Sequence, residues 1–447
     1  MHFHLASYVN FHRLFQDPAY AKEKHLLVTK CKPSQQQFLD AQIQQLSVKD
    51  PMYHIRLAEL KQQKSQHLTK QKESPIYVIK YDKQFITKEN CTSLGLFRSV
   101  VVNEDRILSF SPPKALPFQY FKDTWDGSAS HGIIPLEFVE GTMINVFYDT
   151  TRAVWEIATR SNIGAHYTFY RDHPKTFHDM FMEAMGSVQF SALDTKYSYS
   201  FVLQHSDNRI VTPFDQSKVI LTNMYECQEG DVKALTHVEV CEYAHNLGIN
   251  TPRPLHTVVN FTSYTLANWE YYFKSQDIDY CIMGGVFLHP SGVRTKLRNP
   301  NYEYVRSLRG NSPKLQYQYY HIRQLGKMPE LLRFYPELKG KCAALRSQLH
   351  EWSARLYKNY VTCYIKRDKI FKEYSKEFQP HMHSLHQIYL RELRPAGLSI
   401  NRPRVNNYIN SLEPGRLMYS INYKLKEQYL MDQKKKQIAT INELLKV

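Results

Sequence analysis

The sequence predicts an α+β fold with antiparallel sheets, followed by an all-helical domain that is basic. Short runs of β-branched and aromatic residues, separated by turn residues, recur from Ile76 to about residue 290. After Pro313 the apolar residues recur at three- and four-residue spacing instead, which is typical of helices. The whole net charge of +16 lies in this last third. Because 447 residues exceed the usual size of one domain, we expect more than one.

The first 75 residues are expected to form an N-terminal helical arm. Residues 35–73 are rich in Gln and Lys, and Phe38, Ile43 and Leu46 fall at helical spacing. We interpret this stretch as one or two exposed helices. It fits either a solvated insertion or an element that binds a partner.

Residues 76–305 are expected to form the α+β domain. Strand-like runs outnumber helical ones and come in hairpin-like pairs, which favours antiparallel sheets. Residues 134–157 are predicted to form a strand, a turn and a second strand. The other predicted strands are 76–81, 99–103, 106–110, 197–204, 208–214, 217–225 and 280–288. Helices are predicted at 173–185 and 238–247.

Residues 306–447 are expected to form a basic domain made of helices. Leu349, Trp352, Leu356 and Tyr360, for example, recur every three or four residues. The segment carries 27 Lys and Arg against 11 Asp and Glu, whereas the first 305 residues carry 31 of each kind. Such asymmetry predicts a surface that faces a polyanion, and a well-solvated helical domain is the alternative.

Several classes of protein are not expected. No apolar run reaches the roughly 18–20 residues that span a bilayer, and residues 1–8 lack the layout of a signal peptide, so we expect no membrane partner. The seven cysteines are scattered without a CxxC pair, which argues against a zinc site and a disulfide framework. His381, His383 and His386 lie close together without a further ligand, so no metal site is expected. An intracellular location is the default expectation.

Short motifs spread over about 200 residues point to one chemistry. In chain order they are 97–103, 109–121, 137–144, 157–161, 201–203, 208–211, 284–287 and 296–298. Tyr302 follows the last of them. In this order the motifs resemble those of the adenylation domain of phage-type RNA ligases, a family of covalent nucleotidyltransferases. The resemblance covers about residues 76–305, and the wider sequence is similar to a degenerate branch of this family in large DNA viruses.

The resemblance implies a site in which a lysine attacks the α-phosphate of ATP or GTP and forms a phosphoramidate. It also implies acidic residues that hold a divalent metal and the ribose, and lysines that neutralise the phosphates. Three positions depart from this pattern: the nucleophilic lysine is Phe138, and two glutamates are Val202 and Gly284. Phenylalanine has no nucleophilic atom, so no lysyl-nucleotide forms at position 138. We expect no catalytic residue and no cofactor.

The residues that remain at the other motif positions are basic or structural. The resemblance makes six of them candidates for binding a nucleotide or a phosphate: Arg98, Glu140, Gly141, Arg160, Lys296 and Arg298. Phe138 fits either core packing in the former nucleotide slot or a platform on which a base stacks. The pair at 140–141 also fits a tight turn, and the cations at 296 and 298 also fit an exposed strand face.

We therefore expect a non-catalytic RNA ligase-like protein, a pseudoenzyme that binds nucleic acid or a partner protein. The resemblance implies a protein of a large DNA virus, located in the host cytoplasm or virus factory or packaged in the virion. RNA or DNA bound through residues 306–447, or a viral protein complex, is the expected partner. One alternative is an ATP-dependent RNA ligase that needs ATP and Mg²⁺ and uses a displaced lysine, with Lys114 the nearest candidate. Another is a structural component of a virus particle.

Overall fold

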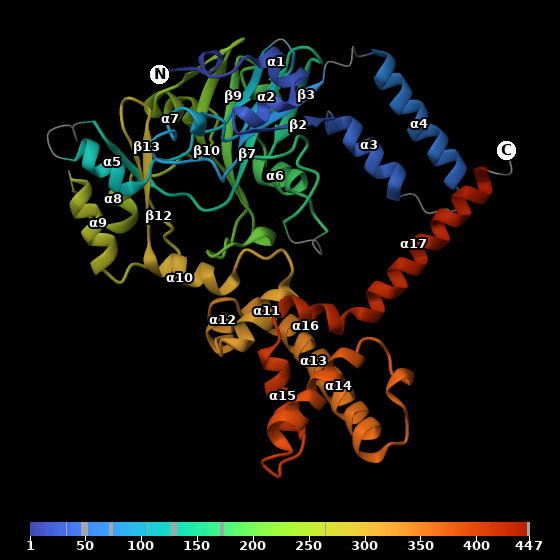
Figure 1. Ribbon diagram of the computed structural model, residues 1–447. Coiled ribbons are helices and arrows are strands. Elements are labelled where there is room, and N and C mark those ends of the chain that lie inside the picture. Colours follow the sequence, from blue (N-terminus) through green and yellow to red (C-terminus); the bar gives the residue numbers. More distant parts are fainter. Residues whose placement is uncertain are drawn as a thin grey trace. The chain divides into compact units, whose positions relative to one another are not determined.

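The chain divides into two compact units, Met1–Arg306 and Ser307–Val447 (Figure 1). The computed structural model describes residues 1–32, 34–45, 52–70, 75–104, 106–126, 132–169, 174–263 and 265–444. The first unit combines strands with helices, and the described part of the second contains helices without strands. The predicted α+β class with antiparallel sheets and a helical C-terminal region is confirmed.

Within the described residues the strands form three antiparallel sheets. The six-stranded sheet has the order β1-β11-β10-β9-β7-β8, the four-stranded sheet β2-β3-β4-β5, and the three-stranded sheet β13-β12-β6. The strands are β1 (His2–His4), β2 (Leu26–Cys31), β3 (Ile76–Tyr81), β4 (Val100–Val102), β5 (Ile107–Phe110), β6 (Ile134–Glu137), β7 (Thr142–Asp149), β8 (Val154–Ala158), β9 (Tyr197–Gln204), β10 (Lys218–Cys227), β11 (Asp231–Ala234), β12 (Gly284–Leu288) and β13 (Arg294–Arg298).

The first unit also contains helices, the last of which crosses the boundary between the units at Arg306. They are α1 (Phe11–Gln16), α2 (Pro18–Glu23), α3 (Ser34–Gln45), α4 (Tyr53–Lys70), α5 (Phe118–Trp125), α6 (Phe177–Met185), α7 (His237–Asn246), α8 (Leu255–Val259), α9 (Leu266–Ser275) and α10 (Pro300–Arg309). Capping boxes fix the starts of α6 and α7, where Thr176 pairs with Asp179 and Thr236 with Glu239.

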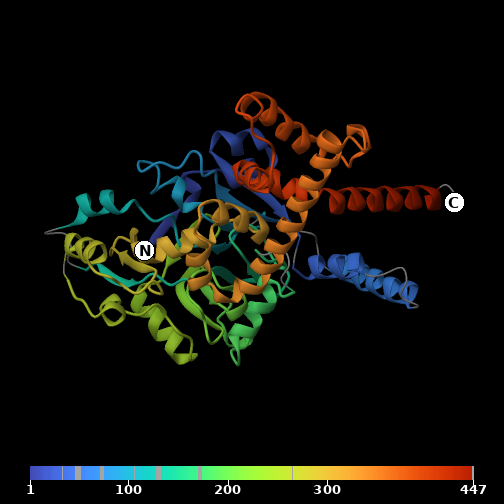
Figure 2. The ribbon, with the colours of Figure 1, turned by 90° about the horizontal axis from the view of Figure 1, so that it is seen from below.

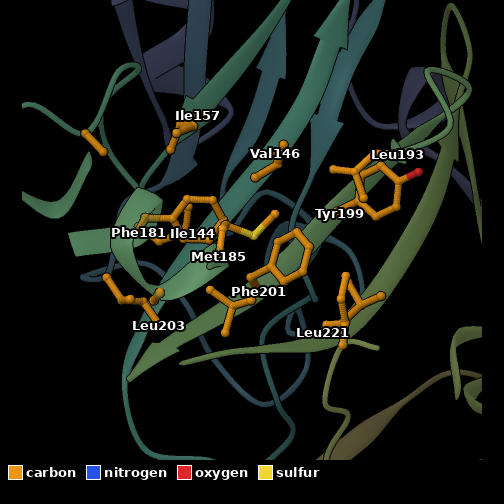
Figure 3. Packing of buried hydrophobic residues seen from close by; sticks show 14 of the residues in the cluster. Ile144, Val146, Ile157, Phe181, Met185, Leu193, Tyr199, Phe201, Leu203 and Leu221 are labelled. Atoms are coloured by element: carbon orange, nitrogen blue, oxygen red, sulfur yellow. The ribbon is translucent and has the colours of Figure 1, made fainter. Parts of the chain in front are cut away.

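The largest core of the first unit lies between the six-stranded sheet and α6 with α7. Ile144 and Val146 of β7 and Phe201 of β9 face Phe181 and Met185 of α6 (Figure 3). Alternate residues of β7 and β9 point to the same face of the sheet, which places these side chains on the side that α6 covers.

Two smaller cores join the other sheets. Val78 and Val101 of the four-stranded sheet pack against Phe147 and Ala158 of the six-stranded sheet. Phe287 of the three-stranded sheet belongs to a separate cluster, in which apolar residues of α5, α8 and α9 cover one face of that sheet. The opposite face of the three-stranded sheet carries the candidate site.

The first 31 residues are part of the sheet-containing unit and do not belong to a helical arm. β1 pairs with β11, β2 pairs with β3, and Leu5, Leu14 and Leu26 lie in the core. Both strands pair with segments far away in sequence, which local periodicity cannot reveal. α3 and α4 lie in the stretch 35–73 where one or two helices were predicted, whereas the short helices α1 and α2 are part of the sheet-containing unit.

Residues 208–214 were predicted as a strand and do not form one. A short 3-10 turn, Ser206–Asn208, is followed by irregular chain. The backbone N–H groups of Val211 and Thr212 bind the carboxylate of Glu140 instead of a neighbouring strand. The segment is therefore a loop, and hydrogen bonds to Glu140 hold it next to the candidate site.

The second unit is a set of helices around a buried stripe. Its helices are α11 (Leu315–Gln324), α12 (Met328–Phe334), α13 (Lys339–Tyr360), α14 (Gln379–Ile388), α15 (Arg402–Ser411), α16 (Pro414–Ile421) and α17 (Tyr423–Leu444). Figure 2 shows α13 and α17 as its long helices. Leu349, Trp352, Leu356 and Tyr360 of α13 are buried, as their spacing predicted. Among the helices of the described residues, none is both long and apolar enough to cross a membrane.

Candidate functional site

Three cations lie in a row on one face of β13. Arg294, Lys296 and Arg298 are two residues apart, so their side chains leave the strand on the same side. Thr295 points the other way, is buried, and donates its hydroxyl hydrogen to the carbonyl of Leu116 at 2.8 Å. All three cations are half-buried. The alternative that Lys296 and Arg298 are simply exposed is thus excluded.

The ring of Phe138 meets two of these cations across β12. Gly284 of β12 is paired with Arg298, and its carbonyl accepts the N–H of Phe138 at 2.9 Å. Glycine places no side chain between the two. The Nζ of Lys296 lies 5.3 Å and the Cζ of Arg298 5.6 Å from the centroid of the Phe138 ring, within the range of cation–π attraction.

The segment before α5 brings more positive charge to this face. Arg98 donates to the carbonyl of Pro112 at 3.3 Å, and Arg294 donates to the carbonyl of Pro113 at 2.8 Å. Lys114, next in the chain, lowers the pKa of Lys296 together with Arg98. The sequence-predicted residues Arg98, Lys296 and Arg298 and the alternative nucleophile Lys114 are therefore brought together.

Arg160 joins the same group from the end of β8. Its Nε donates to the carbonyl of Arg98 at 3.2 Å, and its guanidinium lies 5.2 Å from the centroid of the Tyr81 ring. Lys80, beside it, donates to Ser161 at 3.1 Å, and burial and Arg160 lower its pKa. This makes a continuous group of cations from Lys80 to Arg298.

Burial and mutual repulsion lower the pKa of two cations in this group. Burial lowers the pKa of Lys296 to about 8, and Arg298 is the largest of the neighbouring charges that lower it further. Burial also lowers the pKa of Arg294 to about 10, with Arg98 adding to the effect. Cations that destabilise one another in a half-buried space are stabilised by a bound anion, which removes the repulsion.

Carboxylates do little to neutralise the group. Glu303 of α10 forms ion pairs with Arg298 and, at 3.4 Å, with Arg306. Over the described ranges, Lys114, Arg294 and Lys296 have no ion pair with an acidic side chain. Arg294 and Lys80 were not among the predicted site residues. Arg294 could have been predicted, because side chains two residues apart on a strand, here at positions 294, 296 and 298, point to the same face.

Glu140 does not bind an anion or a metal here. It is buried, and its carboxylate accepts hydrogen bonds from the N–H of Val211 at 2.8 Å and from the N–H and hydroxyl of Thr212 at 3.1 and 2.7 Å. Its backbone carbonyl accepts a further bond from Gln204 at 2.9 Å. Glu140 therefore holds residues 211–212 in place by hydrogen bonds. Its position in the motif alone did not predict this structural role.

Gly141 and Val202 are in contact, and both are structural. Gly141 has φ +148°, and a Cβ there would lie 2.3 Å from the carbonyl oxygen of Leu203 and 2.6 Å from the Cγ1 of Val202. Val202 pairs with Met143 of β7 and is half-buried. Gly141 therefore allows β7 to approach β9, and it binds no ligand through a side chain.

A divalent metal does not fit the residues present. The carboxylate of Glu140 is already bound, and Val202 and Gly284 offer no ligand atom in their side chains. In the part of the chain that the structure describes, no three His, Cys, Asp or Glu side chains are grouped to hold a metal ion. Both ring nitrogens of His381 form hydrogen bonds with hydroxyl groups, Nδ1 with that of Tyr408 at 2.9 Å and Nε2 with that of Ser420 at 2.7 Å.

Phe138 also lines a cavity of about 210 Å³. Its wall includes Glu137, Glu140, Thr212 and Arg253. Glu137 is bound twice by the guanidinium of Arg253, at 2.8 and 3.0 Å. Phe138 is half-buried and lines this cavity, so it is not the packed core residue that one interpretation expected.

The pKa of Lys296 predicts how anion binding depends on pH. Its pKa is lowered to about 8, so the ammonium form is present below pH 8 and is lost as the pH rises through that value. Affinity for a phosphodiester, which does not titrate in this range, should fall above pH 8. Lys296→Arg should flatten the fall, since an arginine at this position stays protonated over this pH range. Fluorescence anisotropy with a labelled oligonucleotide on either side of pH 8 measures this, and equal profiles for both proteins would contradict it.

No protein-family model matches the chain, and neither does any curated protein. Among solved structures it is similar to an archaeal ATP-dependent RNA ligase, with 10% identity over 79% of this chain and 72% of that chain, at a TM-score of 0.34. It is similar to a putative ATP-dependent DNA ligase from Aquifex aeolicus, with 9% identity over 71% and 75% of the two chains, at 0.35. A Naegleria gruberi RNA ligase with AMP and Mn shares 10% identity over 45% and 64%, at 0.30. At TM-scores of this size the likeness to ligases establishes neither a shared activity nor a shared site.

Proposed function

We propose that the chain is a non-catalytic RNA ligase-like protein whose site at Phe138 binds the phosphates of a nucleic acid. The observation that carries the proposal is the placement of Lys296 and Arg298 at 5.3 and 5.6 Å from the ring of Phe138. An aromatic ring stands where the motif order calls for the nucleophile, and cations surround it. The ring offers a surface for a base, and the cations offer partners for phosphate.

The missing carboxylates support binding over catalysis. A nucleotidyl transfer needs a nucleophile and a metal that neutralises the triphosphate. Here Val202 and Gly284 replace two acidic positions and Glu140 is bound to Val211 and Thr212. Phosphate binding needs neither a nucleophile nor a metal when several cations converge, so the residues that remain are sufficient for it.

Removing the two cations beside Phe138 should weaken nucleic-acid binding. Lys296→Ala/Arg298→Ala should lower the affinity of the full chain for a labelled RNA or DNA oligonucleotide about tenfold or more, because each charge-assisted contact contributes about 1.5–3 kcal/mol. The slope of log affinity against log salt should also fall by about two. A salt titration by fluorescence anisotropy measures both quantities.

A matched variant separates site binding from general charge. Lys22→Ala/Lys30→Ala also removes two cations from the first unit, at exposed positions outside the site. It should leave the affinity within about twofold of wild type, because exposed distant charges are screened. Equal losses in the two double variants, or no loss in either, would overturn the proposal.

The second candidate is an ATP-dependent RNA ligase with a displaced lysine. Lys296 favours it, because its pKa of about 8 leaves a substantial fraction of neutral amine near neutral pH. The amine would attack the α-phosphorus of ATP, forming a P–N bond and releasing pyrophosphate, and its proton would pass to solvent. Lys114, the sequence-based candidate, is close enough to lower the pKa of Lys296. Covalent label from [α-³²P]ATP with Mg²⁺ or Mn²⁺, abolished by Lys296→Ala or Lys114→Ala, would establish this function, and its absence would exclude it.

A further inference from the structure

The second unit carries a second cluster of aromatic rings and cations, where α13 and α14 end. Trp352 lies beside Phe378 and His381, and Tyr360 and Tyr364 lie beside His386, so contacts advance along both helices in the same direction. The C-terminal ends of the two helices therefore lie close to each other. The returning chain between them spans residues 367–378.

Both helices end in a π-helical turn. Val361–Lys366 continues α13 and Tyr389–Leu393 continues α14. π-helical turns are rare and are found frequently at functional sites. Two such turns at the same end of a helix pair bring four rings together.

The rings form a partly exposed stack. Tyr364 and His386 have centroids 3.9 Å apart and planes 10° apart, and His386 and Tyr389 have centroids 5.8 Å apart at 24°. Tyr360 is buried beneath them, whereas Tyr364, His386 and Tyr389 are half-buried. Burial lowers the pKa of His386, so its imidazole is neutral at physiological pH. Neutral, nearly parallel rings at a surface are suited to extend their stack with a nucleobase.

Cations surround the stack with few acids. The segments 361–376 and 389–404 carry nine Lys and Arg against three Asp and Glu. Lys366, Arg367, Arg391 and Arg394 are exposed, and none of them forms an ion pair with a residue that the structure describes. Arg367 has φ +60°, a conformation that non-glycine residues adopt rarely. The surface thus combines stacking rings with unpaired positive charge.

We propose that this surface, the helix-end platform of Tyr364, His386 and Tyr389, binds single-stranded nucleic acid. Bases stack on the rings, and Lys366, Arg367, Arg391 and Arg394 contact the phosphates. The complementary charge and the ring geometry favour this occupant over an acidic protein. The inference rests on the proposed function, since it names the strand state and a second surface for the same nucleic acid.

The test compares single-stranded with duplex binding in the full chain. Tyr364→Ala should weaken binding of a labelled single-stranded RNA or DNA about fivefold or more, because one stacked base contributes that much. Duplex affinity should change by less than twofold, because the bases of a duplex already stack on one another. Tyr364→Phe keeps the ring and should bind as wild type does.

A charge-matched pair tests the cations. Lys366→Ala/Arg367→Ala should weaken single-strand binding about tenfold, whereas Lys339→Ala/Lys341→Ala, at the other end of α13, should have less than a twofold effect. Equal effects of the two pairs, or single-strand binding by Tyr364→Ala that equals wild type, would overturn the platform. Binding to phosphatidylserine vesicles that Tyr364→Ala weakens while single-strand binding stays unchanged would show a membrane surface instead and also overturn it.

The experiments can contradict the two proposals independently of each other. If Lys296→Ala/Arg298→Ala weakens binding and the platform variants do not, the site at Phe138 stands and the platform is wrong. If only the platform variants weaken binding, the proposed function of the Phe138 site is wrong and the platform stands.

Discussion

Gly284→Ala should lower the free energy of unfolding of the β12–β13 hairpin by about 3–5 kcal/mol. The residue has φ +136°, and a Cβ would lie 2.1 Å from the carbonyl oxygen of Leu297 and 2.9 Å from the Cα of Arg298. Both atoms belong to the backbone of the paired strand, so neither can move without breaking the pairing. Amide hydrogen exchange of β12 and β13 measures the loss directly.

Gly284→Glu should destabilise the hairpin at least as much as Gly284→Ala does. It would place a carboxylate where the motif order expects one, yet it meets the same backbone clash as alanine. Gly248→Ala is the control, since Gly248 also has positive φ (+66°) but has open space around the position of a Cβ. It should cost only about 1 kcal/mol. A Gly284→Ala protein as stable as the Gly248→Ala protein would contradict this account of the hairpin.

Glu140→Gln should lower the free energy of unfolding of the first unit by about 3–5 kcal/mol. The carboxylate accepts hydrogen bonds from the N–H of Val211 and from the N–H and hydroxyl of Thr212. An amide replaces one acceptor oxygen with a donor, so buried N–H groups lose their partner, and each such loss costs about 1–3 kcal/mol. Denaturant unfolding of the purified variant measures the change.

Glu239→Gln is the matched control for Glu140. Its carboxylate also accepts from a backbone N–H and a hydroxyl, both of Thr236, but it lies at the exposed start of α7. Because water replaces the lost bonds there, the cost should be about 1 kcal/mol or less. If the two variants lose the same free energy of unfolding, the hydrogen bonds of Glu140 do not stabilise the first unit as the structure indicates.

Much of the sheet structure could be predicted from local pattern. β3 and β9 are found at the predicted residues 76–81 and 197–204, β5 lies within the predicted run 106–110, and β10 overlaps the predicted run 217–225, because runs of β-branched and aromatic residues favour strands. β1 and β2 were missed because short strands gain their stability from distant partners, here β11 and β3. Segment 208–214 was mistaken for a strand because its N–H groups bind a side chain from another motif.

The positions of the cations in the site could be predicted from the sequence, but the backbone conformation and the hydrogen bonds around them could not. Alternation along 294–298 places the three cations on one face, and motif order places Arg98 and Arg160 near them. The positive φ of Gly284 depends on how β12 pairs with β13, and the bonds of Glu140 depend on a loop 71 residues away. Those two features account for the structural roles of Gly284 and Glu140.

The measurement that tests the central claim most directly is the titration of the full chain with inorganic pyrophosphate by isothermal calorimetry. A small anion reports on the cations around Phe138 without needing the aromatic platform of the second unit. Wild type should bind it, and Lys296→Ala/Arg298→Ala should bind about tenfold or more weakly, with Lys22→Ala/Lys30→Ala unchanged. Equal affinity in wild type and Lys296→Ala/Arg298→Ala would contradict the claim that the site at Phe138 binds phosphate.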